Sequence, residues 1–154
     1  MNRFIRFGLA AVIMAVAIPV STFAGSEDIT VDGAWARATI GTSRPGVAYM
    51  TLRNVGNEVV VLTAIATPIA MKSGIHETTT NADGVSSMVP AGEITIGPGE
   101  SVALEPGGLH AMLMMLQVPM IEGESFPLTL VFSDGVQMTV EVPILGLGAR
   151  GPEG

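Results

Sequence analysis

Beyond its first two dozen residues the sequence predicts an all-β fold, a sandwich or barrel in a single domain. Short apolar or alternating runs recur between Gly, Pro, Asn and Asp residues, and their spacing is typical of β-sandwiches and barrels. No stretch keeps an apolar period of about 3.6 residues for long enough to form a substantial helix. In chain order, the expected strands cover residues 29–36, 47–54, 59–66, 74–79, 85–89, 93–96, 101–104, 110–116, 127–132 and 136–142.

The N-terminal residues 1–24 are expected to be a secretory signal that is cleaved after Ala24. Arg3 and Arg6 give a positive start, and residues 7–20 form an uncharged, mostly apolar stretch. An uncleaved membrane anchor is the alternative, but a proline and two polar residues make the apolar part short for a membrane span. The chain has no cysteine, so no lipoprotein anchor is expected. We therefore expect a periplasmic protein without stable membrane insertion after cleavage.

Residues 25–144 are expected to form one β domain, and the glycine-rich residues 145–154 a flexible tail. After loss of the signal, 130 residues remain, about one ordinary domain with a single core. They carry five basic and fourteen acidic side chains, a net charge of −9 with histidine neutral, because Arg3 and Arg6 leave with the signal. This charge argues against nucleic acid or anionic lipid as partners and favours cations or basic protein surfaces. Without cysteine there is no disulfide framework, so stability must come from the packed core.

Two hairpins are predicted from alternation and turn residues. Apolar side chains alternate along residues 127–132, a Ser-Asp-Gly turn follows, and alternation resumes along residues 136–142. The sequence Asn-Ala-Asp-Gly at residues 81–84 is a second turn signal. It joins the strand that holds His76 to the strand that holds Met88, so these two residues are expected on neighbouring strands.

Four potential metal ligands include both histidines of the chain, namely His76, Met88, His110 and Met112. Two imidazoles and two thioethers suit Cu(I). His110 and Met112 are separated by one residue, so on a strand both project from the same face. His76 and Met88 can face each other only across a turn with an odd number of residues centred on Ala82, or across an equivalent bulge. An even, two-residue turn would place them on opposite faces and count against a shared site.

Each of these residues also has a structural interpretation. A lone histidine in a β domain is more often a surface or hydrogen-bonded residue than a ligand, and a methionine in a strand is more often core filler. Trp35 and Tyr49 are interpreted as core or sheet-face aromatics rather than as a stacking surface for a ligand. Met114 shares the strand face of His110 and Met112, which makes it the first substitute if one of the four ligands fails. Other methionines are assigned to packing, namely Met50, Met115 and Met138.

The spacing of the four ligands resembles that of the periplasmic copper chaperones called PCu(A)C. Eleven residues separate His76 from Met88, twenty-one separate Met88 from His110, and one separates His110 from Met112. The resemblance covers about residues 28–143. Its flanking sequences are Ala-Trp-Ala-Arg-Ala-Thr at 34–39, Ile-His-Glu-Thr-Thr at 75–79, Leu-Glu-Pro-Gly-Gly-Leu-His-Ala-Met-Leu-Met at 104–114 and Phe-Pro-Leu-Thr-Leu at 126–130.

The resemblance implies a cupredoxin-like (Ig-like) β-sandwich or barrel that binds one Cu(I) per chain through His76, Met88, His110 and Met112. It also implies that the ion passes to a membrane-bound acceptor, either the Cu(A) site of cytochrome c oxidase or another copper chaperone. Glu77 stands where many members have methionine, and no ligand role is carried onto it. The tail lacks histidine and methionine, so no second copper site is expected.

Two other functions fit the sequence pattern: a periplasmic copper-buffering or resistance protein, and a metal-free β-sandwich interaction domain. An enzyme is not expected. Blue-copper electron transfer needs a cysteine thiolate, and a zinc hydrolase would need an acid such as Glu77 to complete the two histidines. Motifs for a catalytic serine, a phosphate loop or a dinucleotide do not rise above chance.

Overall fold

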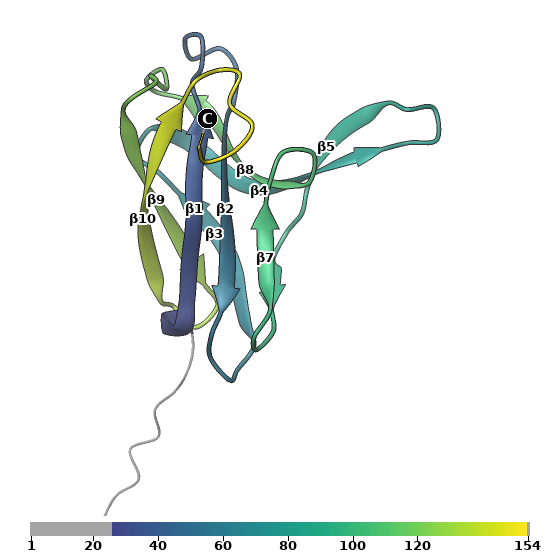
Figure 1. Cartoon of the computed structure of the whole chain (residues 1–154), viewed down its shortest axis with the longest axis vertical. Coiled ribbons are helices and arrows are strands. Elements are labelled where there is room, and N and C mark those ends of the chain that lie inside the picture. The colour runs from purple at the N-terminus through teal and green to yellow at the C-terminus, as the bar shows by residue number, and fades with distance from the viewer. Residues whose placement is uncertain (1–25, 154) are drawn as a thin grey trace, which may run out of the picture.

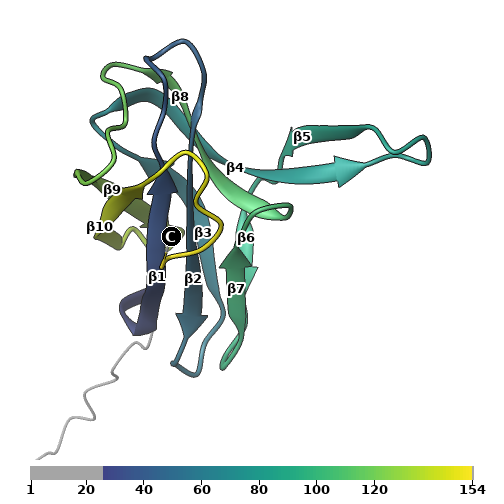
Figure 2. The same cartoon turned by 45° about the horizontal axis from the view of Figure 1, so that its top comes forward.

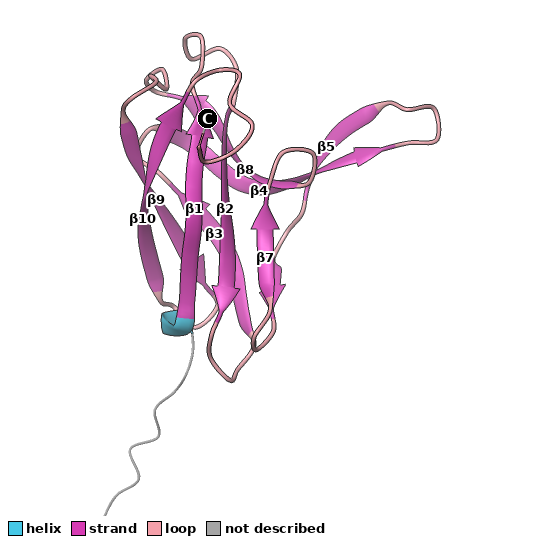
Figure 3. Ribbon diagram, in the orientation of Figure 1, coloured by secondary structure: helices cyan, strands magenta, loops and turns pink. Residues whose placement is uncertain are grey.

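The computed structural model describes residues 26–153, so the expected signal at residues 1–24 lies outside the described residues. The predicted all-β fold is confirmed, because the described chain consists of ten strands, one short 3-10 helix and loops (Figure 3). The elements are η1 (Ser26–Asp28), β1 (Ile29–Arg37), β2 (Gly46–Asn54), β3 (Val60–Ala66), β4 (Ala70–Thr80), β5 (Ser86–Pro90), β6 (Ile94–Ile96), β7 (Ser101–Leu104), β8 (Leu109–Leu116), β9 (Ser125–Phe132) and β10 (Gln137–Leu145).

Each predicted strand is present, and the largest differences lie at strand ends. β4 begins at Ala70 rather than at residue 74, because its first residues pair with β8. Apolar and polar residues do not alternate in this part of the sequence. The start of β4 is therefore determined by its pairing with β8. β10 continues to Leu145 rather than ending at residue 142, since Ile144 and Leu145 pair with β1.

The strands form one continuous sheet in the order β5-β4-β8-β7-β2-β1-β10-β9-β3-β6. A short parallel pairing of β1 with β10 joins its two halves, which fold over each other around a shared core (Figures 1 and 2). Both halves contribute fully buried side chains to this core, for example Leu52, Leu62, Leu113 and Phe126. Burial of apolar area between the two layers is the main favourable term that holds them together.

β4 has two parts with different surroundings. Its residues from Ala70 to Glu77 pair with β8, and those from His76 to Thr80 pair with β5. The β4–β5 hairpin therefore leaves the body of the molecule and projects to one side (Figures 1 and 2). All five residues of β5 are exposed, and β5 is an edge of the sheet.

The C-terminal segment, as far as residue 153, lies against the body of the molecule. Ala149 is buried against Trp35 and Tyr49, and its carbonyl oxygen accepts a 2.8 Å hydrogen bond from Arg37 Nε. The rings of Trp35 and Tyr49 lie 4.6 Å apart, and both are buried, as predicted for core or sheet-face aromatics. Burial raises the pKa of the Tyr49 phenol, and the nearby Arg37 charge offsets part of this rise. Ala149, in this glycine-rich segment, thus packs on the surface of the two aromatic rings.

No helix within residues 26–153 has the length and apolar character needed to cross a membrane.

Candidate metal centre

The two histidines lie side by side on neighbouring strands. The register of β4 and β8 pairs His76 directly with His110, and the ring centroids are 6.2 Å apart with planes inclined by 26°. Their neighbours Ile75 and Ala111 are buried in the core, so strand alternation turns both imidazoles toward the other face of the sheet. Burial of Ile75 and Ala111 thereby holds in place the two strands that carry the histidines.

Each imidazole has one buried nitrogen without a partner. His110 Nδ1 lies 3.2 Å from the carbonyl oxygen of Gly108, which can only accept, so Nδ1 donates and Nε2 keeps a free lone pair. Within residues 26–153, neither His110 Nε2 nor His76 Nδ1 has a hydrogen-bond partner, although both atoms are buried. Buried polar atoms without partners are rare and costly in folded proteins. These two nitrogens are therefore available to bind a metal ion.

Two thioethers continue the same face of β8. Met112 pairs with Gly74 and Met114 pairs with Lys72, and both methionines are partly buried. Because residues two apart on a strand share a face, His110, Met112 and Met114 form one row, as the sequence predicted.

Gly74 leaves open space beside this row. A Cβ atom at Gly74 would lie 3.6 Å from His76 Cε1 and 3.9 Å from His76 Nδ1. The His76 ring thus extends back along β4 over Gly74, with its partnerless nitrogen on that side. Met112 lies opposite Gly74. Because Gly74 has no side chain, an ion beside it could contact both His76 and Met112.

Met88 lies on the same face but not directly opposite His76. The turn between β4 and β5 has five residues and is centred on Asp83, so Met88 pairs with Thr78. The turn has an odd number of residues, which keeps Met88 on the face of His76, but it is not centred on Ala82, which direct pairing of His76 with Met88 required. The physical reason is a longer turn held by Asn81, whose Oδ1 accepts hydrogen bonds from the backbone N–H groups of Asp83 and Val85.

The structure therefore brings three of the four predicted ligands together and leaves the fourth outside. His76, His110 and Met112 lie on the paired part of β4 and β8, whereas Met88 is 54% exposed on the projecting hairpin. Glu77 is exposed, and strand alternation turns it away from the face of His76.

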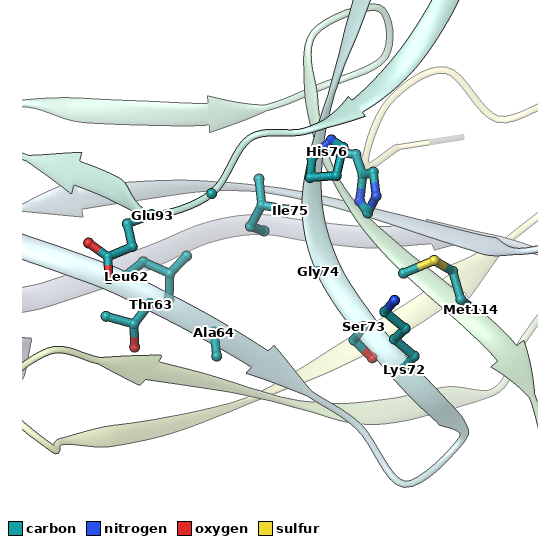
Figure 4. Close-up of a pocket in the computed structure, with 12 residues that line it drawn as sticks. Leu62, Thr63, Ala64, Lys72, Ser73, Gly74, Ile75, His76, Glu93 and Met114 are labelled. Atoms are coloured by element: carbon teal, nitrogen blue, oxygen red, sulfur yellow. The ribbon is translucent and has the colours of Figure 1, made fainter.

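A pocket of about 410 Å³ opens beside the histidine pair, between β3 and β4. Figure 4 shows His76, Lys72 and Met114 among its lining residues. Sequence reasoning singled out Met114 but missed Lys72, Gly74 and Gly108, because their roles depend on cross-strand pairing and on a backbone carbonyl. The two glycines directly before Leu109 were the only signal in the chain that pointed to the Gly108 contact.

Nitrogen, carboxylate and thiolate ligands alone do not form a metal site within the described residues. Residues 26–153 contain no group of three or more His, Cys, Asp and Glu side chains placed to hold a metal ion. The β8 methionines place thioether sulfur next to the histidine pair, and a set of imidazole and thioether donors favours Cu(I) over zinc or harder cations.

Comparisons with known proteins place the chain in a family. The family model described as “Putative lipoprotein LpqE-like” matches residues 29–144. “Putative lipoprotein Lxx21020” of Leifsonia xyli subsp. xyli is 29% identical over 119 residues, which are 77% of this chain and 70% of that protein. Lipoprotein names among the relatives fit an exported protein.

Solved structures give the same answer for the fold. The solution structure of CuI-DR1885 from Deinococcus radiodurans is 34% identical with a TM-score of 0.56, over 73% of this chain and 75% of that chain. The apo PmoF2 PCuAC domain is 19% identical with a TM-score of 0.65, over 80% of this chain and 94% of that chain. The cupredoxin-like fold is thereby confirmed. The chain belongs to the LpqE-like family, and its predicted membership of the PCu(A)C group of copper-chaperone domains is confirmed.

Proposed function

We propose that this protein binds one Cu(I) ion and carries it to an acceptor outside the cytoplasm. The observation that carries the proposal is the pair of buried, partnerless ring nitrogens, His76 Nδ1 and His110 Nε2, beside a row of thioethers. Such nitrogens are costly unless a ligand satisfies them, and a neutral donor set of imidazole and thioether is matched to a soft monovalent ion.

In this proposal, His76 Nδ1, His110 Nε2 and the Met112 sulfur form the supported part of the site. The Gly108 carbonyl holds the His110 ring in the tautomer that leaves Nε2 free. Met88 completes the set from the hairpin. All four ligands are uncharged, so a singly charged ion brings less uncompensated charge into this partly buried place than a divalent ion would.

The exposed position of Met88 supports delivery of the ion to an acceptor. The Met88 side chain is exposed on an edge strand, so the ligands of an acceptor can displace it first and reach the ion while the histidines still hold it. The role is carriage by ligand exchange, with no bond of a substrate made or broken and thus no enzymatic step. The proposed acceptor is membrane-bound, either the Cu(A) site of cytochrome c oxidase or another copper chaperone, in the periplasm.

Titration of the purified protein with Cu(I) against a competing chelator tests the site. Wild type should take up one tight equivalent. His110→Ala should weaken Cu(I) binding by more than about 100-fold, since even a lost outer-shell partner costs about 10- to 100-fold. Met138→Ala is the matched control, because Met138 lies on β10 in the other half of the sheet and should leave affinity unchanged. Undiminished binding by His110→Ala would overturn the assignment.

Buffering is the second candidate, and a gene deletion separates it from delivery. If the protein delivers copper, oxidase activity should fall at limiting copper and recover when copper is added. If it buffers, oxidase activity should persist, and only tolerance to excess copper should be lost.

A further inference from the structure

The partnerless nitrogen of His76 faces away from Met88. Gly74 lies two residues before His76 on the same face, and the Nδ1 edge of the ring is close to it. Met88 pairs with Thr78, two residues on the opposite side of His76. Met112 pairs with Gly74, so the free nitrogen is directed toward the methionines of β8.

Met88 and Met112 are far apart in the observed arrangement of the hairpin. Their register positions differ by four residues along β4, and two strand spacings separate β5 from β8. In a flat sheet this places the two backbones roughly 16 Å apart. The hairpin has to bend toward β8 before both thioethers can bind the same ion.

Met114 lies on the side of His76 where Gly74 and the partnerless nitrogen lie, whereas Met88 lies on the other side. Met114 lines the same pocket as His76, which neither Met88 nor Met112 lines. Figure 4 shows Met114, His76 and Lys72 among the residues that line this pocket. Met112 and Met114 are two residues apart on one strand face, so both sulfurs can approach an ion beside Gly74 without movement of the backbone.

We infer that Met114 is a further thioether ligand of Cu(I), which holds the ion together with Met112 while the hairpin is in the projecting position seen here. Met88 replaces Met114 when the hairpin bends inward, and the exchange runs in reverse when the ion leaves. This inference rests on the proposed function. The ion then keeps two nitrogen and two sulfur ligands in both arrangements, so opening the hairpin for an acceptor does not leave it undercoordinated.

X-ray absorption of the Cu(I)-loaded protein counts the sulfur ligands directly. Methionine is changed to leucine throughout, because this substitution conserves volume. Met88→Leu should still show two sulfur ligands, and Met88→Leu with Met114→Leu should show one. The double variant should also bind Cu(I) at least about 10-fold more weakly than Met88→Leu, since a direct ligand counts for no less than an outer-shell partner.

Met88→Leu with Met71→Leu is the matched control, because Met71 is an exposed methionine on β4 outside the site, and it should match Met88→Leu. A single sulfur in Met88→Leu, or two sulfurs that persist in Met88→Leu with Met114→Leu, would overturn the role of Met114. A wild-type protein that binds no Cu(I), or binds it without sulfur, would instead overturn the proposed function.

Discussion

The β9–β10 and β4–β5 hairpins were both predicted from their turns, and they differ in what they contact. In the β9–β10 hairpin, Leu128, Leu130 and Phe132 are at most 2% exposed because the other half of the sheet covers them. In the β4–β5 hairpin, every residue of β5 is exposed, and Figure 2 shows it projecting from the body. The β9–β10 hairpin is part of the core, whereas β5 and the end of β4 that pairs with it bury no side chain.

This difference indicates what the projecting hairpin is for. A strand that buries no side chain contributes little to the free energy of folding, and an open sheet edge exposes unpaired backbone groups. Met88 and Val89 are nevertheless apolar and exposed there. The β4–β5 hairpin is thus better explained by contact with an ion or a partner than by stability, whereas β9–β10 is explained by stability alone.

Truncation of one buried and one exposed side chain gives the largest expected difference. Leu128→Ala should lower the free energy of unfolding by about 3 kcal/mol, since it removes a fully buried leucine. Val89→Ala on β5 should change it by less than about 0.5 kcal/mol. Denaturant unfolding followed by circular dichroism measures both. Equal losses in the two variants would show that the projecting hairpin packs against something in solution.

The sequence predicted both hairpins, β9–β10 from apolar alternation and a Ser-Asp-Gly turn, and β4–β5 from the turn sequence Asn-Ala-Asp-Gly. It left the register of β4 and β5 open: direct pairing of His76 with Met88 required a turn centred on Ala82, whereas the Asn81 side chain stabilises a five-residue turn centred on Asp83. Met88 pairs with Thr78 and not with His76, which is a shift of two residues. Because side chains alternate with a period of two, Met88 still lies on the same face as His76.

Other features of the site could not be read from one strand at a time. The row of His110, Met112 and Met114 follows from spacing on a single strand. The free space at Gly74 beside Met112, and the position of Met114 in the pocket that His76 lines, depend on which residue of β4 lies opposite which residue of β8. Cross-strand pairing is a tertiary property, and no pattern along the chain encodes it.

Filling the space at Gly74 should have an intermediate effect, on Cu(I) binding rather than on folding. Gly74→Val places methyl groups between His76 and Met112 and should weaken binding by about 10-fold, comparable with loss of an outer-shell contact. Gly74→Ala should be mild, because its Cβ meets the ring at ordinary contact distance. Thr78→Val, on the projecting part of β4, should leave affinity unchanged. If Thr78→Val weakened binding more than Gly74→Val, the site would belong to the hairpin instead of the body.

The smallest expected effect is on stability and concerns the turns of the β9–β10 and β4–β5 hairpins. In both turns a side-chain oxygen accepts a hydrogen bond from a backbone N–H group, but the side chains differ. Asp134 Oδ1 accepts from the backbone N–H of Val136, as Asn81 Oδ1 does from Val85. Asp134 also accepts from the backbone N–H and the hydroxyl of Ser26. These hydrogen bonds, led by the Ser26 backbone N–H, hold the pKa of Asp134 below its usual value of 3.8.

A pKa that is lower in the folded protein stabilises the fold only while the carboxyl is ionised. The contribution of Asp134 is therefore complete above pH about 4 and is lost as the pH falls through the folded pKa. Asp134→Asn should lower the urea midpoint slightly at pH 7 and differ less from wild type at pH 3. Asn81→Ala in the other turn should instead show a loss that does not depend on pH, because an amide does not titrate in this range. If the difference between Asp134→Asn and wild type were the same at both pH values, the Ser26 contacts would not act through the charge of Asp134.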